Sequence, residues 1–290
     1  MLEVTMVNTI GNPLSWTAKA VLNSGEKAVE LTSHVASDQA RKPPVVNKIG
    51  MEDIRYAVKK GFEDLGAFRT DVMILCLLYP VIGLLLVAVS FRADMAPFAF
   101  PLLSGFAILG PIAAVGLYEM SRRREEGLDA SWSDALSVLR APSVGAMLVF
   151  GVYLLVIFAA WLAAAGIIHA QTMGGIEARS PVEFFRNVLT TQEGLAMVAI
   201  GIPVGGVFAA IALAIGIVTV PLLLDRDVGL AAAIGTSLAL VRRNPVTVGL
   251  WGAMIAVSLA LAAVPFLLGL VLVMPVLGHA SWHFYRRAVS

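Results

Sequence analysis

Two histidines near the C-terminal end are the most suggestive side chains for chemistry in this sequence. His279 and His283 are four residues apart, so on a helix both rings would lie on one face and could bind one metal ion or a haem. The pair lacks a HExxH glutamate and an evident third ligand. A haem or metal site at these two residues therefore stays open as an alternative, while our prediction is that the chain binds no cofactor or metal.

Other catalytic patterns are missing from the sequence. There is no phosphate-binding loop, no nucleophile paired with a base and no paired-carboxylate site. Glu125 and Glu126 follow Arg122 to Arg124, which is typical of a solvated run of charges. Cys76 is the single cysteine and lies in an apolar run, so no disulfide can form within the chain. We therefore expect a protein that is not an enzyme.

The composition is that of an integral membrane protein. Hydrophobic residues make up 58% of the 290 residues and charged residues 14%, with a mean hydropathy of +0.83. Soluble domains carry about 25% charged residues. The uncharged residues form long blocks that match the length of membrane helices. The net charge of +1 gives no electrostatic reason to expect a nucleic-acid partner.

The blocks predict an all-α, polytopic membrane helix bundle with six spans. The uncharged stretch 246–282 exceeds one span, so we divide it at a turn near Pro265. Lys59 and Lys60 place the start of the chain in the cytoplasm by the positive-inside rule, and Arg286 and Arg287 place the end there. Both termini on one side require an even number of spans. The predicted spans are 72–91, 97–118, 144–168, 195–224, 246–263 and 265–284.

Each pair of spans follows a helix expected to lie on the membrane surface. These amphipathic or short apolar segments are 51–68, 132–140 and 228–241, so the domain 48–290 is a threefold repeat of a surface helix and a hairpin. Residues 1–47 mix charges with Gly, Ser and Pro, which predicts a disordered cytoplasmic tail. Predicted anchors at the headgroup level are Trp132, Trp282, Tyr285 and Arg286.

The spans themselves restrict the function. Asp, Glu, Lys, Arg and His are missing from their middle, which argues against an ion-coupled transporter or a proton pump. Gly201, Gly205 and Ala209 form a small-residue face on the fourth span. Such a face allows close approach of another helix, either within the bundle or from a partner protein.

Two segments resemble an uncharacterised family of bacterial inner-membrane proteins, catalogued as a domain of unknown function. The closing segment 275–286, Pro-Val-Leu-Gly-His-Ala-Ser-Trp-His-Phe-Tyr-Arg, resembles the family's C-terminal signature, and 49–65 resembles its opening. The resemblance covers roughly residues 47–288 and implies a location in the bacterial inner membrane. Some members carry the label putative cytochrome c oxidase. A haem–copper catalytic subunit needs more buried histidine ligands than this pair, so the label implies an accessory or assembly role.

Two functions follow as hypotheses. The first is a non-catalytic accessory, assembly or scaffold component, linked by the family label to respiratory oxidases, with another membrane protein or a respiratory complex as its partner. The alternative is a carrier or channel for a neutral or lipid-like solute, motivated by the repeat and by prolines within the spans. In both cases the lipid bilayer is the surrounding partner.

Overall fold

The computed structural model describes residues 44–290, apart from 68–71, 74–75, 93–94, 130 and 177–179. In these residues the fold is helical, with one isolated antiparallel bridge between Val46 and Val289. The elements are α2 (Met51–Ala67), α4 (Leu78–Arg92), η1 (Ala96–Phe98), α5 (Ala99–Ala113), α6 (Val115–Glu125), α7 (Trp132–Ala135), η2 (Leu136–Arg140), α8 (Val144–Thr172), α9 (Pro181–Thr190), α10 (Gln192–Gly216), α11 (Thr219–Asp225), α12 (Leu230–Arg243), α13 (Pro245–Ala263) and α14 (Leu270–Ala288).

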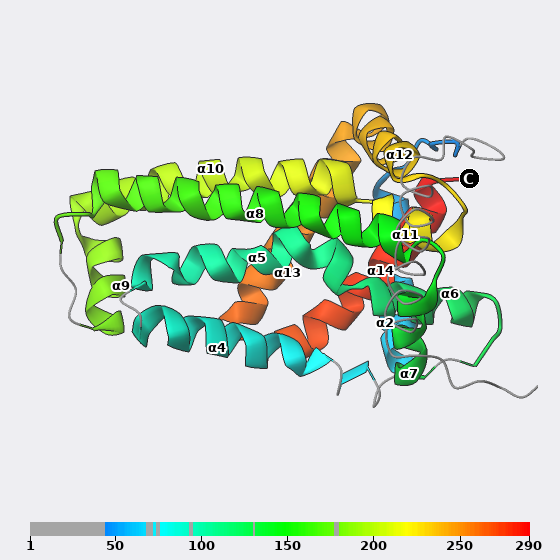
Figure 1. Cartoon of the computed structure of the whole chain (residues 1–290), viewed down its shortest axis with the longest axis horizontal. Coiled ribbons are helices and arrows are strands. Elements are labelled where there is room, and N and C mark those ends of the chain that lie inside the picture. The colour runs from blue at the N-terminus through cyan, green and yellow to red at the C-terminus, as the bar shows by residue number, and fades with distance from the viewer. Residues whose placement is uncertain (1–43, 68–71, 74–75, 93–94, 130, 177–179) are drawn as a thin grey trace, which may run out of the picture.

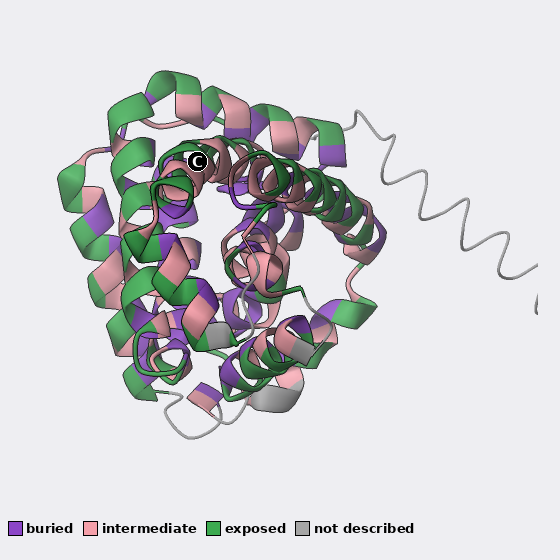
Figure 2. Cartoon of the chain, turned by 90° about the vertical axis from the view of Figure 1, so that its left-hand side faces the viewer, coloured by how far each residue is buried: buried purple, intermediate pink, exposed green. Residues whose placement is uncertain are grey.

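The helices form an elongated bundle with two different ends (Figure 1). Helices α4, α5, α8 and α10 run along the long axis, and α9 lies across one end. Helices α2, α7 and α12 gather at the other end with the last part of α14, which we call the terminal end. The long helices are apolar all round, and residues coloured as exposed lie along their outer faces (Figure 2). This pattern is that of helices whose outer surface contacts lipid.

Within the described residues, four stretches are long and apolar enough to cross a membrane, so the prediction of six spans is wrong. They are Ala96–Glu125, Val144–Thr172, Gln192–Asp225 and Pro245–Ala263. The predicted first span, 72–91, contains the shorter helix α4. The predicted last span, 265–284, corresponds to α14, whose C-terminal half is polar and packs against α2 and α6. The absence of charges in 265–282 predicts a lipid-facing helix, but α2 and α6 cover much of α14.

The break between α10 and α11 has a local cause. Pro221 lies in the first turn of α11, and its ring cannot coexist with a helical carbonyl four residues earlier, at Ile217. Helix α10 accordingly ends at Gly216 and α11 begins at Thr219. Pro203, in contrast, lies within α10 without ending it.

Helix α2 packs on protein, where the sequence had suggested the membrane surface. Ile54, Ala57 and Leu65 are buried in the main core. At Gly61 the backbones of α2 and α14 come so close that an added Cβ would lie 2.7 Å from the Val276 carbonyl oxygen. Only glycine allows this approach.

We therefore predict that Gly61→Ala destabilises the fold. Overpacking against a backbone atom typically costs 1–3 kcal/mol, and the new methyl group cannot displace the Val276 carbonyl as it could a flexible side chain. Thermal unfolding of the purified protein in detergent measures the effect. Gly66→Ala is the matched control on the same helix, because an added Cβ there meets no atom within 4 Å. An equal loss in both variants would contradict the prediction.

The two ends of the described chain lie side by side. Val45 N donates to Ser290 O and Asn47 N donates to Ala288 O, at 3.0 and 2.8 Å. Residues 44–47 therefore belong to the folded unit, although the predicted tail included them. The rest of that predicted tail, 1–43, lies outside the described residues.

Candidate functional site

A buried polar cluster joins three helices at the terminal end. Asp64 of α2 is 3% exposed and accepts hydrogen bonds at Oδ2 from Ser121 Oγ, at 2.6 Å, and from His283 Nε2, at 2.8 Å. Arg124 Nη1 binds its other oxygen at 2.6 Å. Ser121 Oγ also lies 2.8 Å from His279 Nδ1. The network thus runs from His279 through Ser121 and Asp64 to His283 and joins α14, α6 and α2.

The cluster pairs the Asp64 carboxylate with the Arg124 guanidinium. Burial alone would raise the pKa of Asp64, but hydrogen bonds from His283 and Ser121 outweigh it and hold that pKa below its ordinary value. Burial lowers the pKa of His279 to about 4, so this ring is neutral at pH 7. The ionised Asp64 is therefore balanced by Arg124. Because the hydroxyl hydrogen of Ser121 points to Asp64, the His279 ring serves as donor to Ser121 Oγ.

This geometry does not favour the alternative of a metal or haem site. The structure brings His279 and His283 together, but it places Asp64 and the cationic Arg124 between or beside them, and a guanidinium repels a metal ion. The described residues contain no group of three His, Cys, Asp or Glu side chains arranged to hold a metal. The order of the network also differs from a catalytic triad, since the carboxylate binds the serine directly.

A second polar network surrounds the predicted headgroup anchors on α14. Trp282 Nε1 donates to Glu125 at 2.9 Å, and the Tyr285 hydroxyl donates to Asp225 at 2.6 Å. Arg286 bridges both acids, at 3.0 and 3.2 Å. Trp282 and Tyr285 are fully buried and therefore do not face lipid headgroups, so their predicted role as anchors is wrong.

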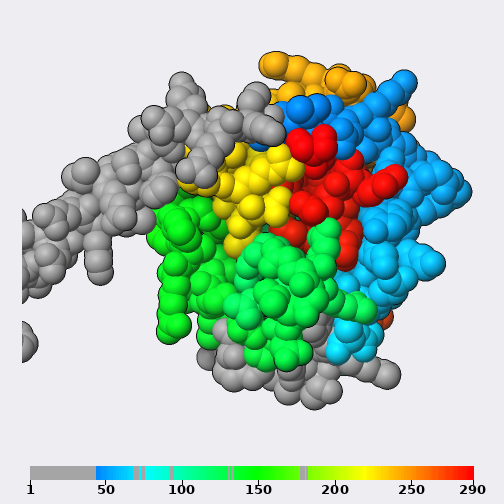
Figure 3. All heavy atoms as spheres, turned by 90° about the vertical axis from the view of Figure 1, so that its right-hand side faces the viewer, coloured from blue at the N-terminus to red at the C-terminus, as the bar shows by residue number. Residues whose placement is uncertain are grey.

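Of the other two predicted anchors, Arg286 is 39% exposed at its side chain and binds Glu125 and Asp225, and the Trp132 side chain lies outside the described residues. Figure 3 shows the terminal end of the molecule, where α14, in red, reaches the surface between α2, in blue, and α6, in green.

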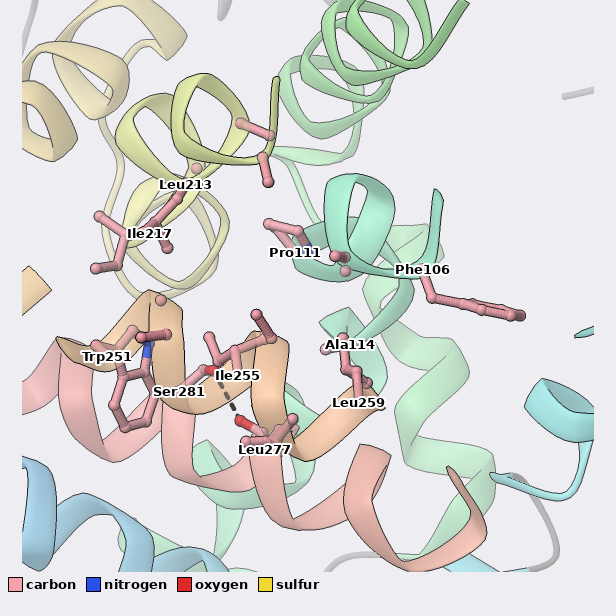
Figure 4. A pocket seen from close by; sticks show the side chains of 18 of the residues that line it. Phe106, Pro111, Ala114, Leu213, Ile217, Trp251, Ile255, Leu259, Leu277 and Ser281 are labelled. Carbon is pink, nitrogen blue, oxygen red and sulfur yellow. Dashed lines mark hydrogen bonds between the residues drawn. The ribbon is translucent and has the colours of Figure 1, made fainter. Parts of the chain in front are cut away.

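An apolar cavity of about 370 Å³ lies between α5, α6, α10, α13 and α14 (Figure 4). Its described lining contains no charged residue, and its polar side-chain groups are the hydroxyls of Tyr118 and Ser281 and the indole N–H of Trp251. Ser281 Oγ donates to the Leu277 carbonyl at 2.7 Å, which leaves its lone pairs as an acceptor. The lining is Phe106, Ala107, Gly110, Pro111, Ala114, Tyr118, Gly206, Ala209, Ala210, Ala212, Leu213, Gly216, Ile217, Gly249, Trp251, Gly252, Ala253, Ile255, Ala256, Leu259, Met274, Leu277, Gly278 and Ser281.

Glycines create the space in this cavity. A Cβ added at Gly206 or Gly249 would meet no atom within 4 Å, so both positions border open volume. Of the predicted small-residue face, Ala209 lines the cavity, and an added Cβ at Gly205 would lie 3.0 Å from the Trp161 ring of α8. Gly201 has open space around it and lies outside the cavity lining. Gly206, which also lines the cavity, lies next to this face and was not among the predicted residues.

Helix α14 connects the cavity to the polar cluster. Met274, Leu277, Gly278 and Ser281 recur at the spacing of one helical face and line the cavity. His279 and His283 lie on a neighbouring face and bind into the polar cluster. The packing of α14 on α2 and α6 therefore positions one wall of the cavity.

Long apolar helices with exposed outer faces, together with an uncharged cavity, define a multi-pass integral membrane protein of unknown function. Residues 99–225 match the family described as predicted integral membrane protein (DUF2189). This match extends from α5 to α11, so neither of the two segments that carried the sequence resemblance lies within it. No curated protein and no solved structure matches the chain.

Proposed function

We propose that this membrane protein binds one neutral, lipid-like molecule in the cavity between α5, α10, α13 and α14. The observation that carries the proposal is the cavity itself, with its volume of about 370 Å³ and its uncharged lining. Ligand pockets in proteins typically measure 300–1,000 Å³ and are mostly apolar with few polar groups.

The lining restricts the class of ligand. A phosphate or carboxylate group would lose its hydration without gaining a cationic partner from the described lining residues, so an anionic headgroup is disfavoured. The few polar groups of the lining, which are the Tyr118 and Ser281 hydroxyls and the Trp251 indole N–H, suit a ligand with a single hydroxyl or carbonyl group. We therefore expect a hydrocarbon body with one small neutral polar group. A carrier for a lipid-like solute needs such a binding site. A carrier is the alternative function that the sequence suggests.

Filling the cavity should abolish binding. Gly206→Leu and Gly249→Leu each place a side chain in open volume, so both variants should fold. The amount of ligand bound per protein should fall at least ten-fold in each. Native mass spectrometry and solvent extraction of the protein purified in mild detergent measure the bound molecule. Gly201→Leu is the matched control on α10, because Gly201 also has free space but does not line the cavity. Wild-type protein that carries no apolar molecule after mild purification and binds none on addition would overturn the proposal.

A second candidate is the accessory or assembly role expected from the sequence. The open space beside Gly201 on α10 favours it, since a glycine with a free neighbourhood on a span allows a partner helix to approach closely. The same purification tests it: a membrane protein that co-purifies with the wild type and is lost in Gly201→Leu would support this role. Loss of a bound ligand in Gly206→Leu would support the proposed binding of a lipid-like molecule. A link to respiratory oxidases stays a prediction that a deletion strain's oxidase activity would test.

A further inference from the structure

The turn between α13 and α14 is made of apolar residues and is highly exposed. Val264, Phe266 and Leu268 are 76%, 79% and 59% exposed, and Pro265 lies between the first two. The connection between α11 and α12, at the terminal end, instead contains Arg226 and Asp227. An exposed turn without a polar side chain is unfavourable in water because each apolar group is hydrated. Its surroundings should therefore be hydrocarbon.

The position of this turn agrees with its composition. In Figure 1 the turn lies near the middle of the long axis, well short of α9, and both α13 and α14 slant away from it toward the terminal end. Helix α13 has 19 residues, whereas α8, which extends over the whole bundle, has 29. The hairpin of α13 and α14 thus begins and ends at the terminal end.

The backbone of the turn is adapted to a place without water. Leu267 N donates to Ala263 O and Leu268 N donates to Pro265 O, at 3.1 and 3.0 Å, and proline has no N–H group to satisfy. Phe266 and Leu267 have φ angles of 51° and 64°, a left-handed conformation that costs about 1–2 kcal/mol per residue. Such strain persists only where surrounding contacts fix it.

Leu267 provides the contact that fixes the turn. It is 5% exposed and packs against α4, where an added Cβ at Gly83 would lie 2.5 Å from Leu267 Cδ1. Its neighbours include Phe106 and Leu103 of α5. The turn is therefore held against the sides of α4 and α5, away from either end of the bundle.

We propose that α13 and α14 form a re-entrant hairpin whose tip, Val264–Leu268, lies in the hydrocarbon interior of the bilayer. In this topology α13 turns back although it is long enough to cross, and the chain crosses along the shorter α4 and along α5–α6, α8 and α10–α11. The hairpin enters and leaves on one side. A re-entrant hairpin adds no crossing, so both termini stay on the same side of the membrane. Since α13 and α14 supply Leu259 and Met274 to the cavity wall, the lipid that surrounds the tip is also next to the cavity.

Cysteine accessibility in membrane vesicles of both orientations tests this topology. The full chain with Cys76→Ala receives one cysteine, at Phe266 on the tip, at Arg186 on α9 or at Arg243 on α12. A membrane-impermeant maleimide should label the Arg186 variant from one side, the Arg243 variant from the other and the Phe266 variant from neither. Labelling of all three after denaturation confirms that each thiol is present.

A second measurement separates a thiol in lipid from one buried in protein. Bimane attached at position 266 in reconstituted vesicles should be quenched strongly by lipids with a nitroxide deep in the acyl chain and weakly by a nitroxide at the headgroup. Labelling of the Phe266 variant from the Arg186 side would show a full crossing, and labelling from the Arg243 side would place the tip outside the bilayer. Either result overturns the proposal, as does a fluorophore that lipid nitroxides do not quench. Val264→Cys repeats the test should Phe266→Cys not fold.

Discussion

Asp64→Ala is expected to lower the free energy of unfolding by about 3–5 kcal/mol, the typical cost of removing one partner from a buried charged pair. The variant leaves Ser121 and His283 without their acceptor and removes the balancing charge from Arg124. The Arg124 side chain is 40% exposed and can turn toward water, which moderates the loss. Chemical unfolding in mixed micelles, followed by tryptophan fluorescence, measures the change.

Glu63→Ala is the matched control for this variant. Glu63 is the neighbour of Asp64 in the chain, but its side chain is 38% exposed and pairs with Lys60 on the surface. Pairs of this kind contribute roughly 0–1 kcal/mol. If the two alanine variants were equally stable, the Asp64 network would not hold the helices together.

The stability of the protein should also fall as the pH is lowered from about 6.5 to 4. The unfolded chain binds a proton at His279 with the ordinary pKa of 6.5, whereas burial lowers the folded-state pKa to about 4. Within this window the unfolded state holds more protons, so acid favours unfolding, and the loss amounts to about 3 kcal/mol. Below about 3.8 protonation of Asp64 acts in the same direction, because its pKa is also lowered by folding.

Unfolding curves at pH 7.5 and at pH 4.5 measure this effect, and His279→Gln isolates it. The glutamine variant should be less stable at pH 7.5, because the contact with Ser121 changes, but its stability should depend less on pH through the window. A wild type whose stability does not change between these pH values would contradict the neutral, buried state of His279.

Much of the membrane architecture could be predicted from the sequence. The second to fifth predicted spans coincide with the four candidate spans Ala96–Glu125, Val144–Thr172, Gln192–Asp225 and Pro245–Ala263, because a long uncharged block admits few structures other than a membrane helix. The short helix α9 begins with a cap of a kind common at helix starts, where Ser180 accepts from the Glu183 N–H. Periodicity and length are local properties, and they were sufficient for these elements.

The sequence could not show which uncharged helix is covered by protein. The positive charges near both termini require an even number of crossings. A transmembrane hairpin adds two crossings and a re-entrant hairpin adds none, so this rule cannot distinguish them. Burial of α14 depends on Gly61, more than two hundred residues earlier, and on its contacts with α2. A pattern within one segment carries no information about such a distant neighbour.

The contacts of His279 and His283 also depend on residues far away in the sequence. Their spacing by itself determined that His279 and His283 lie on one helical face, because four residues make about one turn. Only the tertiary structure decided that the two rings bind Asp64 and Ser121, since these residues come from α2 and α6. Asp64 belongs to a charged segment that predicts a solvated face, and its burial follows from packing alone. The physical reason is that chain geometry fixes neighbours within a helix, whereas contacts between helices depend on how their surfaces fit.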